Sequence, residues 1–446
     1  MDIFVVGAGY VGLTTAATLS YLGHRVVVHD LDAERTAMLA RGRSPIFEPG
    51  LEDAIREGLA SGRLRFTDEA LAPAETETAF VCVPTPADAE GLLDTAAVES
   101  VVIRLFASLP AGRVIAVRST LPLDGPQRLT AAIGEAPGAA VVVNPEFMRE
   151  GRALEDARHP SRVVVGWLRP ADADTARRFA TVYEPLDAPT IIADAASVVL
   201  MKLASNVFLG TKIAFADELA RLSDAIGADV GTVVDGLGLD PRIGRAFLDA
   251  GPGFGGSCLP EQAASIAVET GRRGMDTPLM SSIARSNTAH QAQVVVAIGR
   301  QLPQGLDGAR VAVLGLSFKA NTDDVRFSPA LALIRGLREA GAAVIAYDPV
   351  ATAPARRADP ALETATSAAE AVREADAVVV VTEWAEFGSL DWSQLAPTMR
   401  GTLVYDTRRI LGAEAVEAAG LRYVGLGRRP SAAPAIAAAM RSGAAV

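Results

Sequence analysis

The sequence predicts an α/β protein with two doubly wound sheets that are joined by a central helical segment. Short apolar runs, which suit buried parallel strands, alternate with helical patterns up to about residue 193 and again from residue 301 to about residue 428. In residues 194–300 strand-like runs nearly vanish and helical periodicity dominates. We therefore expect domains at residues 1–193, 194–300 and 301–428, followed by an Ala-rich tail at residues 429–446.

The composition is that of a globular protein and argues against several other classes. Of the 446 residues, 50% are hydrophobic and 21% are charged, and the length requires more than one core. The net charge of −11 argues against a nucleic-acid-binding protein, although a local basic pocket for a phosphorylated ligand remains compatible with it. Two cysteines that lie far apart in sequence, Cys82 and Cys258, fit a reducing compartment better than a disulfide framework. No basic leader precedes the first strand and the apolar runs fall short of a membrane span, so we expect a soluble, cytoplasmic protein without membrane contact.

A glycine-rich turn follows the first strand-like run, residues 2–6. The turn reads GAGYVG and leads into a helical pattern. In such a turn Gly7 allows the tight bend, Gly9 lets the backbone approach a pyrophosphate, and Gly12 lets the helix pack on the strand. The helix N-terminus would face the phosphates. With strand and helix both in place, a glycine turn without any ligand is the weaker alternative.

The second strand ends in an acid, Asp30, which would hydrogen-bond a ribose hydroxyl and thus favours NAD. Arg35 lies nearby and could instead accommodate a 2′-phosphate, so NADP is the alternative. The fingerprint predicts a Rossmann-like site that binds NAD.

Polar residues follow three further strand-like runs. The run at residues 79–83 stops at two prolines, the run at 114–118 ends at Ser119 and Thr120, and the run at 141–143 ends at Asn144. Open α/β sheets use the carboxyl ends of their strands to line a site, although any one of these residues could equally be a cap or a turn former. Cys82 lies inside an apolar run, so we interpret it as a small core residue.

The central helical segment carries a lysine in apolar surroundings. Lys202 and Asn206 are four residues apart and therefore share one helix face. Although a solvated face is commoner for a lysine, the flanking residues are apolar, so we expect Lys202 to be partly desolvated and to have a partner. A long helix in this region could also pair with a second subunit.

One loop, residues 251–262, surrounds a single cysteine with glycines and small residues. Glycines allow close backbone approach and positive φ angles. In a chain that opens with a nucleotide fingerprint, Cys258 is a candidate nucleophile, and a flexible loop with an incidental thiol is the alternative.

A second α/β unit begins near residue 309. It repeats the strand, glycine turn and helix of the N-terminus but lacks the full glycine triplet. Lys319, Arg326, Arg408 and Arg409 could hold phosphates in this unit, or could equally be surface charges.

Taken together, the ordered motifs resemble those of the UDP-glucose/GDP-mannose dehydrogenase family over residues 1 to about 426. The matching segments are GAGYVG (7–12), SPIFEPGL (44–51), VPTP (83–86), RSTLP (118–122), NPEFMRE (144–150), KLASN (202–206), GFGGSC (253–258), GLSFK (315–319) and NTDD (321–324). The resemblance implies two Rossmann-like domains joined by a long helix that forms a homodimer.

The resemblance also implies a reaction. Such an enzyme oxidises the C6 alcohol of a nucleotide sugar to a carboxylate with two NAD⁺. The first oxidation gives an aldehyde, which the cysteine thiolate attacks to form a thiohemiacetal. A second hydride transfer gives a thioester, and water hydrolyses it.

Individual residues acquire expected roles from the same resemblance. Cys258 would be the nucleophile, and Lys202 would stabilise the oxyanion with the help of Asn206. Thr120, Glu146 and Glu150 would position water and act as acid or base. The implied cofactor contacts are Gly7, Gly9, Tyr10, Val11, Gly12, Asp30, Arg35, Thr85, Thr120 and Glu150. The implied substrate contacts are Glu146, Phe147, Met148, Lys202, Asn206, Gly255, Lys319, Arg326 and, from the neighbouring subunit, Arg242, and no metal site is expected.

One departure from the family pattern follows the cysteine. Family members read Lys-Asp where this chain has Glu261 and Gln262, so the net charge of the pair changes from zero to −1. An anion near a thiol raises its pKa, and Gln262 cannot accept a proton. We expect weakened or altered catalysis, such as a stalled reaction, an aldehyde product or a changed cofactor contact.

Three hypotheses about function follow. The first is a dehydrogenase that acts on UDP-glucose, and the second is a sister enzyme for GDP-mannose or a UDP-N-acetylhexosamine, because the sequence fixes neither base nor sugar. The third is a catalytically impaired homologue that binds these ligands without full turnover. The pair at residues 261–262 argues for the third hypothesis, and the residues that argue against it are Cys258, Lys202, Asn206, Thr120 and Glu150.

Overall fold

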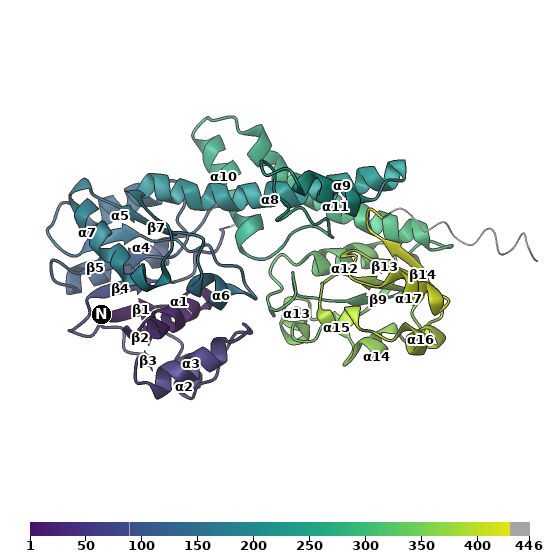
Figure 1. Cartoon of the computed structure of the whole chain (residues 1–446), viewed down its shortest axis with the longest axis horizontal. Coiled ribbons are helices and arrows are strands. Elements are labelled where there is room, and N and C mark those ends of the chain that lie inside the picture. The colour runs from purple at the N-terminus through teal and green to yellow at the C-terminus, as the bar shows by residue number, and fades with distance from the viewer. Residues whose placement is uncertain (89, 429–446) are drawn as a thin grey trace, which may run out of the picture. The chain divides into compact units, whose positions relative to one another are not determined.

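A computed structural model of the chain describes residues 1–88 and 90–428 (Figure 1). The chain divides into two compact units. The first comprises Met1–Val207, Glu261–Ser281 and Asn321–Asp323, and the second comprises Phe208–Pro260, Ser282–Ala320 and the described residues from Asp324 onward. The tail predicted at residues 429–446 lies outside the described residues.

The first unit is built on a sheet of eight strands in the order β3-β2-β1-β4-β5-β6-β7-β8. Its strands are β1 (Asp2–Val6), β2 (Arg25–His29), β3 (Leu64–Thr67), β4 (Thr78–Val81), β5 (Val114–Val117), β6 (Ala140–Val143), β7 (Val163–Trp167) and β8 (Thr190–Asp194). All neighbours pair in parallel except β6 and β7, which are antiparallel. The strand order reverses between β1 and β4, and this is the point at which open α/β sheets bind ligands.

Helices connect these strands, as the alternating apolar pattern predicts. They are α1 (Tyr10–Tyr21), α2 (Ala33–Ala40), α3 (Leu51–Ala60), α4 (Ala96–Ser108), α5 (Gly125–Ile133), α6 (Ala153–Arg158) and α7 (Ala173–Ala180), with 3₁₀ turns at Pro170–Asp172 and Thr181–Leu186. The side chains of β1, β4, β5 and β6 are almost all buried, because helices cover both faces of a doubly wound sheet.

The second unit contains a parallel sheet of six strands in the order β11-β10-β9-β12-β13-β14. Its strands are β9 (Arg310–Leu314), β10 (Ala343–Tyr347), β11 (Glu363–Thr364), β12 (Ala377–Val380), β13 (Leu403–Asp406) and β14 (Arg422–Gly425). Its helices include α9 (Val230–Gly238), α12 (Pro329–Glu339), α13 (Thr352–Ala358), α14 (Ala368–Val372), α15 (Ala385–Gly388), α16 (Trp392–Leu395) and α17 (Ala413–Ala418), with a 3₁₀ turn at Ala396–Thr398. The predicted fold class, two doubly wound sheets with a helical segment between them in sequence, is confirmed.

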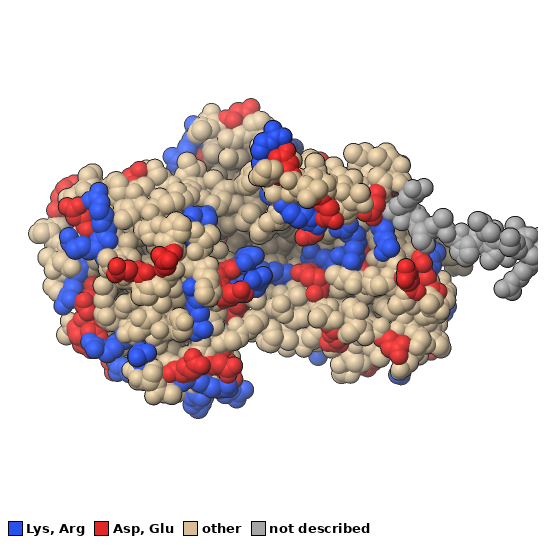
Figure 2. Space-filling model, in the orientation of Figure 1, with Lys and Arg blue, Asp and Glu red and all other residues tan. Residues whose placement is uncertain are grey.

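Three helices of the central segment pass along the chain from one unit into the other. They are α8 (Ala195–Ile226), α10 (Cys258–Arg272) and α11 (Pro278–Gln301). The expectation that all apolar runs fall short of a membrane span was wrong for α8, which is long and apolar enough to cross a membrane. Core helices of soluble proteins share these properties, so α8 is weak evidence for a membrane. On the visible face of each unit, acidic and basic side chains are interspersed (Figure 2).

Both sheets use the same glycine turn after their first strand. Gly7 has a φ of +102°, and a Cβ there would lie 2.6 Å from the Cys82 carbonyl oxygen. Gly315 has a φ of +101°, and a Cβ there would lie 2.4 Å from the Thr382 side chain. In each turn only glycine both adopts this backbone conformation and lets the next strand lie this close.

The structure predicts unequal effects on stability when alanine replaces two glycines of the first turn. A Cβ on Gly12 would lie 1.8 Å from the Gly7 carbonyl oxygen, whereas a Cβ on Gly9 would meet no atom within 4 Å. We expect Gly12→Ala to lower the free energy of unfolding by about 3 kcal/mol or more, because the backbone must move. Gly9→Ala should change it by less than about 0.5 kcal/mol. Urea unfolding of the two variants beside wild type measures both values, and equal losses would contradict the structure.

Candidate active site

The turn between β1 and α1 forms an open cradle. No side chain caps the N-terminus of α1 at Gly9, and the space in which a Gly9 Cβ would lie is open. The first-turn amides of a helix attract anions, so this cradle fits the pyrophosphate of a dinucleotide.

Asp30 lies beside this cradle, immediately after β2. Its carboxylate accepts hydrogen bonds from the Ala8 amide at 2.7 Å and the Asp32 amide at 3.0 Å. Burial opposes ionisation of Asp30, but these backbone hydrogen bonds, together with Arg35 at 3.3 Å, hold its pKa below the ordinary value. Asp30 is therefore a fixed anion at the position where a ribose hydroxyl would donate, which fits NAD, and Arg35 is engaged with Asp30.

Cys82 is a core residue, as predicted. It is buried at the end of β4, and burial raises the pKa of its thiol to about 12. Thr85 and Thr120, which follow β4 and β5, are both half-buried.

A buried ion pair lies at the carboxyl end of β6. Lys202 Nζ on α8 donates to Glu146 Oε1 at 2.8 Å and to the Glu146 carbonyl oxygen at 2.6 Å, and Lys202 is only 4% exposed. Burial works against ionisation of Glu146, but Lys202 outweighs it and lowers the pKa of the carboxyl below its ordinary value. The expectation that Lys202 is desolvated and partnered is confirmed.

An amide pair lies one turn further along α8. Asn206 Nδ2 donates to Gln262 Oε1 on α10 at 2.9 Å, and Gln262 is 3% exposed. The residue that departs from the family pattern thus contacts another predicted site residue directly. Phe147 lies in the same region, with Lys202 Nζ 5.3 Å and the Arg162 guanidinium 3.8 Å from its ring centroid.

Sequence reasoning missed the residues that hold the segment at 144–153 in place. Glu48 is buried and accepts hydrogen bonds from the Gly151 amide at 2.6 Å and the Ala153 amide at 2.7 Å. Arg118 is also buried and donates to Asn144 Oδ1 at 2.9 Å and Thr15 Oγ1 at 2.8 Å. Both residues lie in segments that the family resemblance singled out, and this was their one signal in the sequence. Tyr10, a predicted cofactor contact, accepts from the Gly151 amide at 2.7 Å, and Glu150 is half-buried.

The cysteine loop, residues 251–257, belongs to the second unit. Residues 251–256 are buried, and the loop passes very close to its neighbours. A Cβ on Gly255 would lie 2.4 Å from the Phe327 carbonyl oxygen, and a Cβ on Gly256 would lie 2.9 Å from the Phe318 ring. The loop is therefore closely packed, which argues against the alternative of a flexible glycine-rich loop.

Asn287 on α11 fixes the middle of the cysteine loop. Its Oδ1 accepts from the Phe254 amide at 2.9 Å and its Nδ2 donates to the Phe254 carbonyl oxygen at 3.0 Å. Cys258 follows as the first residue of α10 and is half-buried. A helix N-terminus stabilises a thiolate, so this position favours a reactive cysteine.

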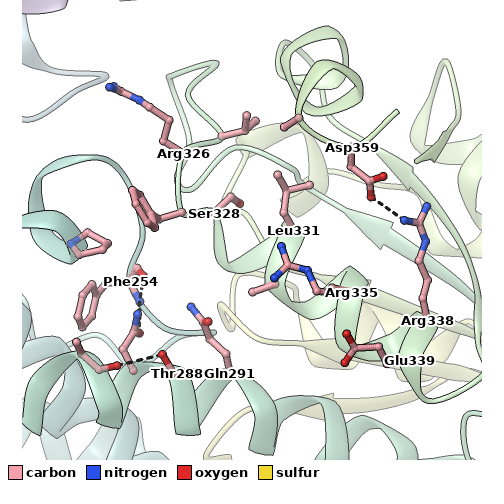
Figure 3. Close-up of a pocket in the computed structure, with 17 residues that line it drawn as sticks. Phe254, Thr288, Gln291, Arg326, Ser328, Leu331, Arg335, Arg338, Glu339 and Asp359 are labelled. Carbon is pink, nitrogen blue, oxygen red and sulfur yellow. Dashed lines mark hydrogen bonds and ion pairs between the residues drawn. The ribbon is translucent and has the colours of Figure 1, made fainter. Parts of the chain in front are cut away.

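A cavity of about 940 Å³ lies beside the loop within the second unit (Figure 3). Phe254, Phe327 and Arg326 contribute to its lining, and Arg326 is paired with Asp324 at 2.6 Å. Lys319 Nζ lies 5.2 Å from the centroid of the Phe318 ring. Arg408 is engaged with the Val381 carbonyl oxygen at 2.9 Å and with Glu383 at 3.0 Å, so it is not a free surface charge.

The predicted site residues thus form two groups. In the first unit the structure brings together Lys202, Glu146, Asn206 and the unexpected Gln262. The second unit contains Cys258, Gly255, Lys319, Arg326 and Arg242, and the Arg242 side chain is exposed and paired with Asp240 at 2.6 Å.

Comparison with known proteins gives the family. Residues 1–187 match the NAD-binding domain of the UDP-glucose/GDP-mannose dehydrogenase family, residues 196–289 match its central domain, and residues 312–413 match its UDP-binding domain. A UDP-glucose 6-dehydrogenase of Rhizobium meliloti is 39% identical over 442 residues, which cover 96% of this chain and 100% of that protein. The UDP-glucose 6-dehydrogenase AglM of Haloferax volcanii is 37% identical and covers 92% of this chain and 97% of its own.

Solved structures agree with the sequence comparison. A UDP-glucose dehydrogenase from Pyrobaculum islandicum superimposes with a TM-score of 0.85 at 34% identity, covering 96% of this chain and 98% of its own. A UDP-D-ManNAc dehydrogenase from Pyrococcus horikoshii gives a TM-score of 0.82 at 26% identity, covering 96% of this chain and 99% of its own. The chain belongs to the UDP-glucose/GDP-mannose dehydrogenase family and is an NAD-dependent nucleotide-sugar dehydrogenase.

Proposed function

We propose that the protein oxidises C6 of UDP-glucose to the carboxylate of UDP-glucuronate in two steps that pass through Cys258. The observation that carries this proposal is the position of Cys258 at the N-terminus of a helix, at the end of a rigid loop. The relatives named above as UDP-glucose 6-dehydrogenases support the choice of sugar.

In the first step the C6 alcohol becomes an aldehyde. The cradle at residues 7–12 would hold NAD⁺, which would supply the acceptor for the hydride from C6. Water held by Thr120 and Glu150 takes the hydroxyl proton.

In the second step Cys258 makes the covalent intermediate. Its thiolate attacks the aldehyde carbon and gives a thiohemiacetal, and Lys202 stabilises the oxyanion. Loss of a second hydride to NAD⁺ turns the thiohemiacetal into a thioester. Glu146, kept ionised by Lys202, removes a proton from the water that attacks the thioester, which releases the acid and regenerates the thiol.

Gln262 supports an alternative outcome. Because its amide cannot accept a proton, the last step has one base fewer than in relatives with an acid at this position. A protein that releases the aldehyde, or that binds without turnover, is therefore the second candidate. The third candidate is a sister enzyme that acts on GDP-mannose or on a UDP-N-acetylhexosamine. Of these two substrates, the similarity to the UDP-D-ManNAc dehydrogenase favours the UDP-N-acetylhexosamine.

The yield of NADH distinguishes these outcomes. With limiting UDP-glucose and excess NAD⁺, we expect two NADH per sugar, because both oxidations occur at one carbon. Cys258→Ser should yield no more than one, since no thioester can form. Cys82→Ala is the matched control, because Cys82 is buried away from solvent, and it should retain a yield of two. One NADH per sugar in wild type would show release of the aldehyde, and no NADH with any of these nucleotide sugars would leave a binding protein.

The role of Gln262 can be tested by an isosteric change. Gln262→Glu keeps an acceptor for Asn206 Nδ2 and adds a base, so we expect turnover to UDP-glucuronate to rise by about tenfold or more. Gln262→Met, which removes the acceptor, controls for the loss of the Asn206 contact and should lower turnover. Equal turnover in wild type and Gln262→Glu would show that the neutral amide suffices.

We also propose a homodimer that forms along α8. Phe208, Phe215, Leu222 and Ile226 recur at spacings of seven, seven and four residues, and all four are exposed. Such spacing aligns them on one face of a helix, and an exposed apolar stripe of this kind is typical of an interface. No disulfide joins Cys82 and Cys258, which fits our proposal of a cytoplasmic location.

The stripe predicts how the dimer can be disrupted. Phe215→Arg should shift the protein from dimer to monomer, because it would bury an unpaired charge at the interface. Leu239→Arg is the control, since Leu239 is exposed but lies outside α8. Light scattering after size-exclusion chromatography gives the mass of both variants. A dimeric Phe215→Arg variant would show that the interface does not lie along this face of α8.

A further inference from the structure

A buried pair of titratable side chains lies against the start of the cysteine loop. Asp217 on α8 and His290 on α11 are each 1% exposed, and both contact Gly251. The proposed reaction uses neither residue. Through Gly251 they contact the segment that leads to Cys258.

The two side chains hold Gly251 from both sides. The Gly251 amide donates to Asp217 Oδ1 at 2.8 Å, and His290 Nε2 donates to the Gly251 carbonyl oxygen at 2.7 Å. Arg221 Nη1 donates to His290 Nδ1 at 2.6 Å. Because an arginine can only donate, the histidine proton must be on Nε2, and the three residues form one ordered chain of donors.

The charge on Asp217 is poorly compensated. Its Oδ2 is buried and has no hydrogen-bond partner among the described residues. Burial raises the pKa of Asp217 to about 7, although the Gly251 amide, Arg408 and Arg221 oppose this and Glu218 adds to it. Burial also lowers the pKa of His290 to about 4, so His290 stays neutral throughout the range in which Asp217 titrates.

The other anchors of the cysteine loop do not titrate. Asn287 holds Phe254, and the Gly256 amide donates to the Arg326 carbonyl oxygen at 2.9 Å. A change of pH near neutrality therefore alters one anchor of the loop, at Gly251, and leaves the remaining two unchanged.

We propose that Asp217 is a positioning residue: in its protonated form it keeps Gly251 and the cysteine loop seated, and its ionisation loosens them. The reason is the thermodynamic linkage between ionisation of the Asp217 carboxyl and its exposure to water. A carboxyl that prefers its neutral form when covered, and ionises at an ordinary pKa of about 4 when hydrated, favours the hydrated arrangement as the pH rises. Release of Gly251 gives water access to the unpartnered Oδ2. The catalytic consequence rests on the proposed role of Cys258, whereas the coupling itself does not.

Hydrogen exchange tests the coupling without any turnover. In the full-length protein, exchange of peptides that cover residues 247–257, corrected for the intrinsic effect of pH, should become up to about tenfold faster between pH 6 and pH 8. In Asp217→Asn, which keeps an acceptor for the Gly251 amide but cannot ionise, the corrected rate should not change. Asp217→Ser serves the same purpose if the asparagine variant does not fold.

A matched control is available on the same helix. Asp224 lies seven residues after Asp217, and its pKa is also raised by burial, but its backbone partner is Gly427 and not the cysteine loop. Asp224→Asn should therefore show the same pH dependence in the loop as wild type. Equal pH dependence in wild type and both Asp217 variants would overturn the proposal.

The same variants connect the coupling to catalysis. The ratio of the NADH production rate of Asp217→Asn to that of wild type should rise between pH 6 and pH 8, because only wild type loses loop order. A constant ratio together with a pH-dependent exchange difference would leave the coupling intact and would instead contradict the role of the loop in the reaction. Unchanged exchange would overturn the coupling itself.

Discussion

The buried ion pair of Lys202 and Glu146 is the interaction on which the arrangement of the first unit's site depends. It joins α8 to the segment after β6 through two hydrogen bonds from one ammonium group, at 2.6 and 2.8 Å. Removing one partner of such a pair typically costs about 3–5 kcal/mol, whereas replacing both by apolar residues is often neutral. Stability alone therefore gives little reason to keep the pair. Its value lies in fixing an ammonium and an ionised carboxylate at known positions, where Asn206 and Gln262 extend the polar region by one helical turn.

In the second unit, close packing fixes the loop that leads to Cys258, the proposed nucleophile. A rigid loop requires close packing, and the glycines at positions 255 and 256 let the loop backbone approach a carbonyl oxygen and an aromatic ring closely. Asn287 then satisfies both the amide and the carbonyl oxygen of Phe254 inside the protein. Glycine is often associated with mobility, but here the absence of side chains permits contacts that immobilise the backbone.

Much of this arrangement could be predicted from the sequence because it depends on local patterns. Apolar runs, the GAGYVG turn and Asp30 are sufficient to place β1, α1 and β2, and the apolar flanks of Lys202 are sufficient to predict its burial. The contact between Asn206 and Gln262 could not be predicted, because it joins residues 56 positions apart. Likewise Glu48 and Arg118 act on backbone and side-chain groups far away in the chain, and no local pattern marks a carboxylate or a guanidinium for such a task. The apolar length of α8 was underestimated because isolated polar residues interrupt its runs, although a window average remains hydrophobic.

The turn at Gly315, after the first strand of the second sheet, differs from the corresponding turn of the first sheet because side chains close it. In the second sheet Asp348 occupies the place that Asp30 has in the first, and it accepts from the Leu316 amide at 2.7 Å, the Ser317 amide at 3.1 Å and Trp384 Nε1 at 3.1 Å. Asp348 is 2% exposed, and Ser328 and Thr382 donate to the carbonyl oxygens of Leu316 and Ser317. The second turn is thus sealed by its own side chains, while the first remains open. The two strand–turn–helix units therefore differ in one respect. The first turn leaves space for a ligand, whereas side chains fill the second turn and give it a structural role. A nucleotide recognised by the second unit must then be held by side chains outside this turn.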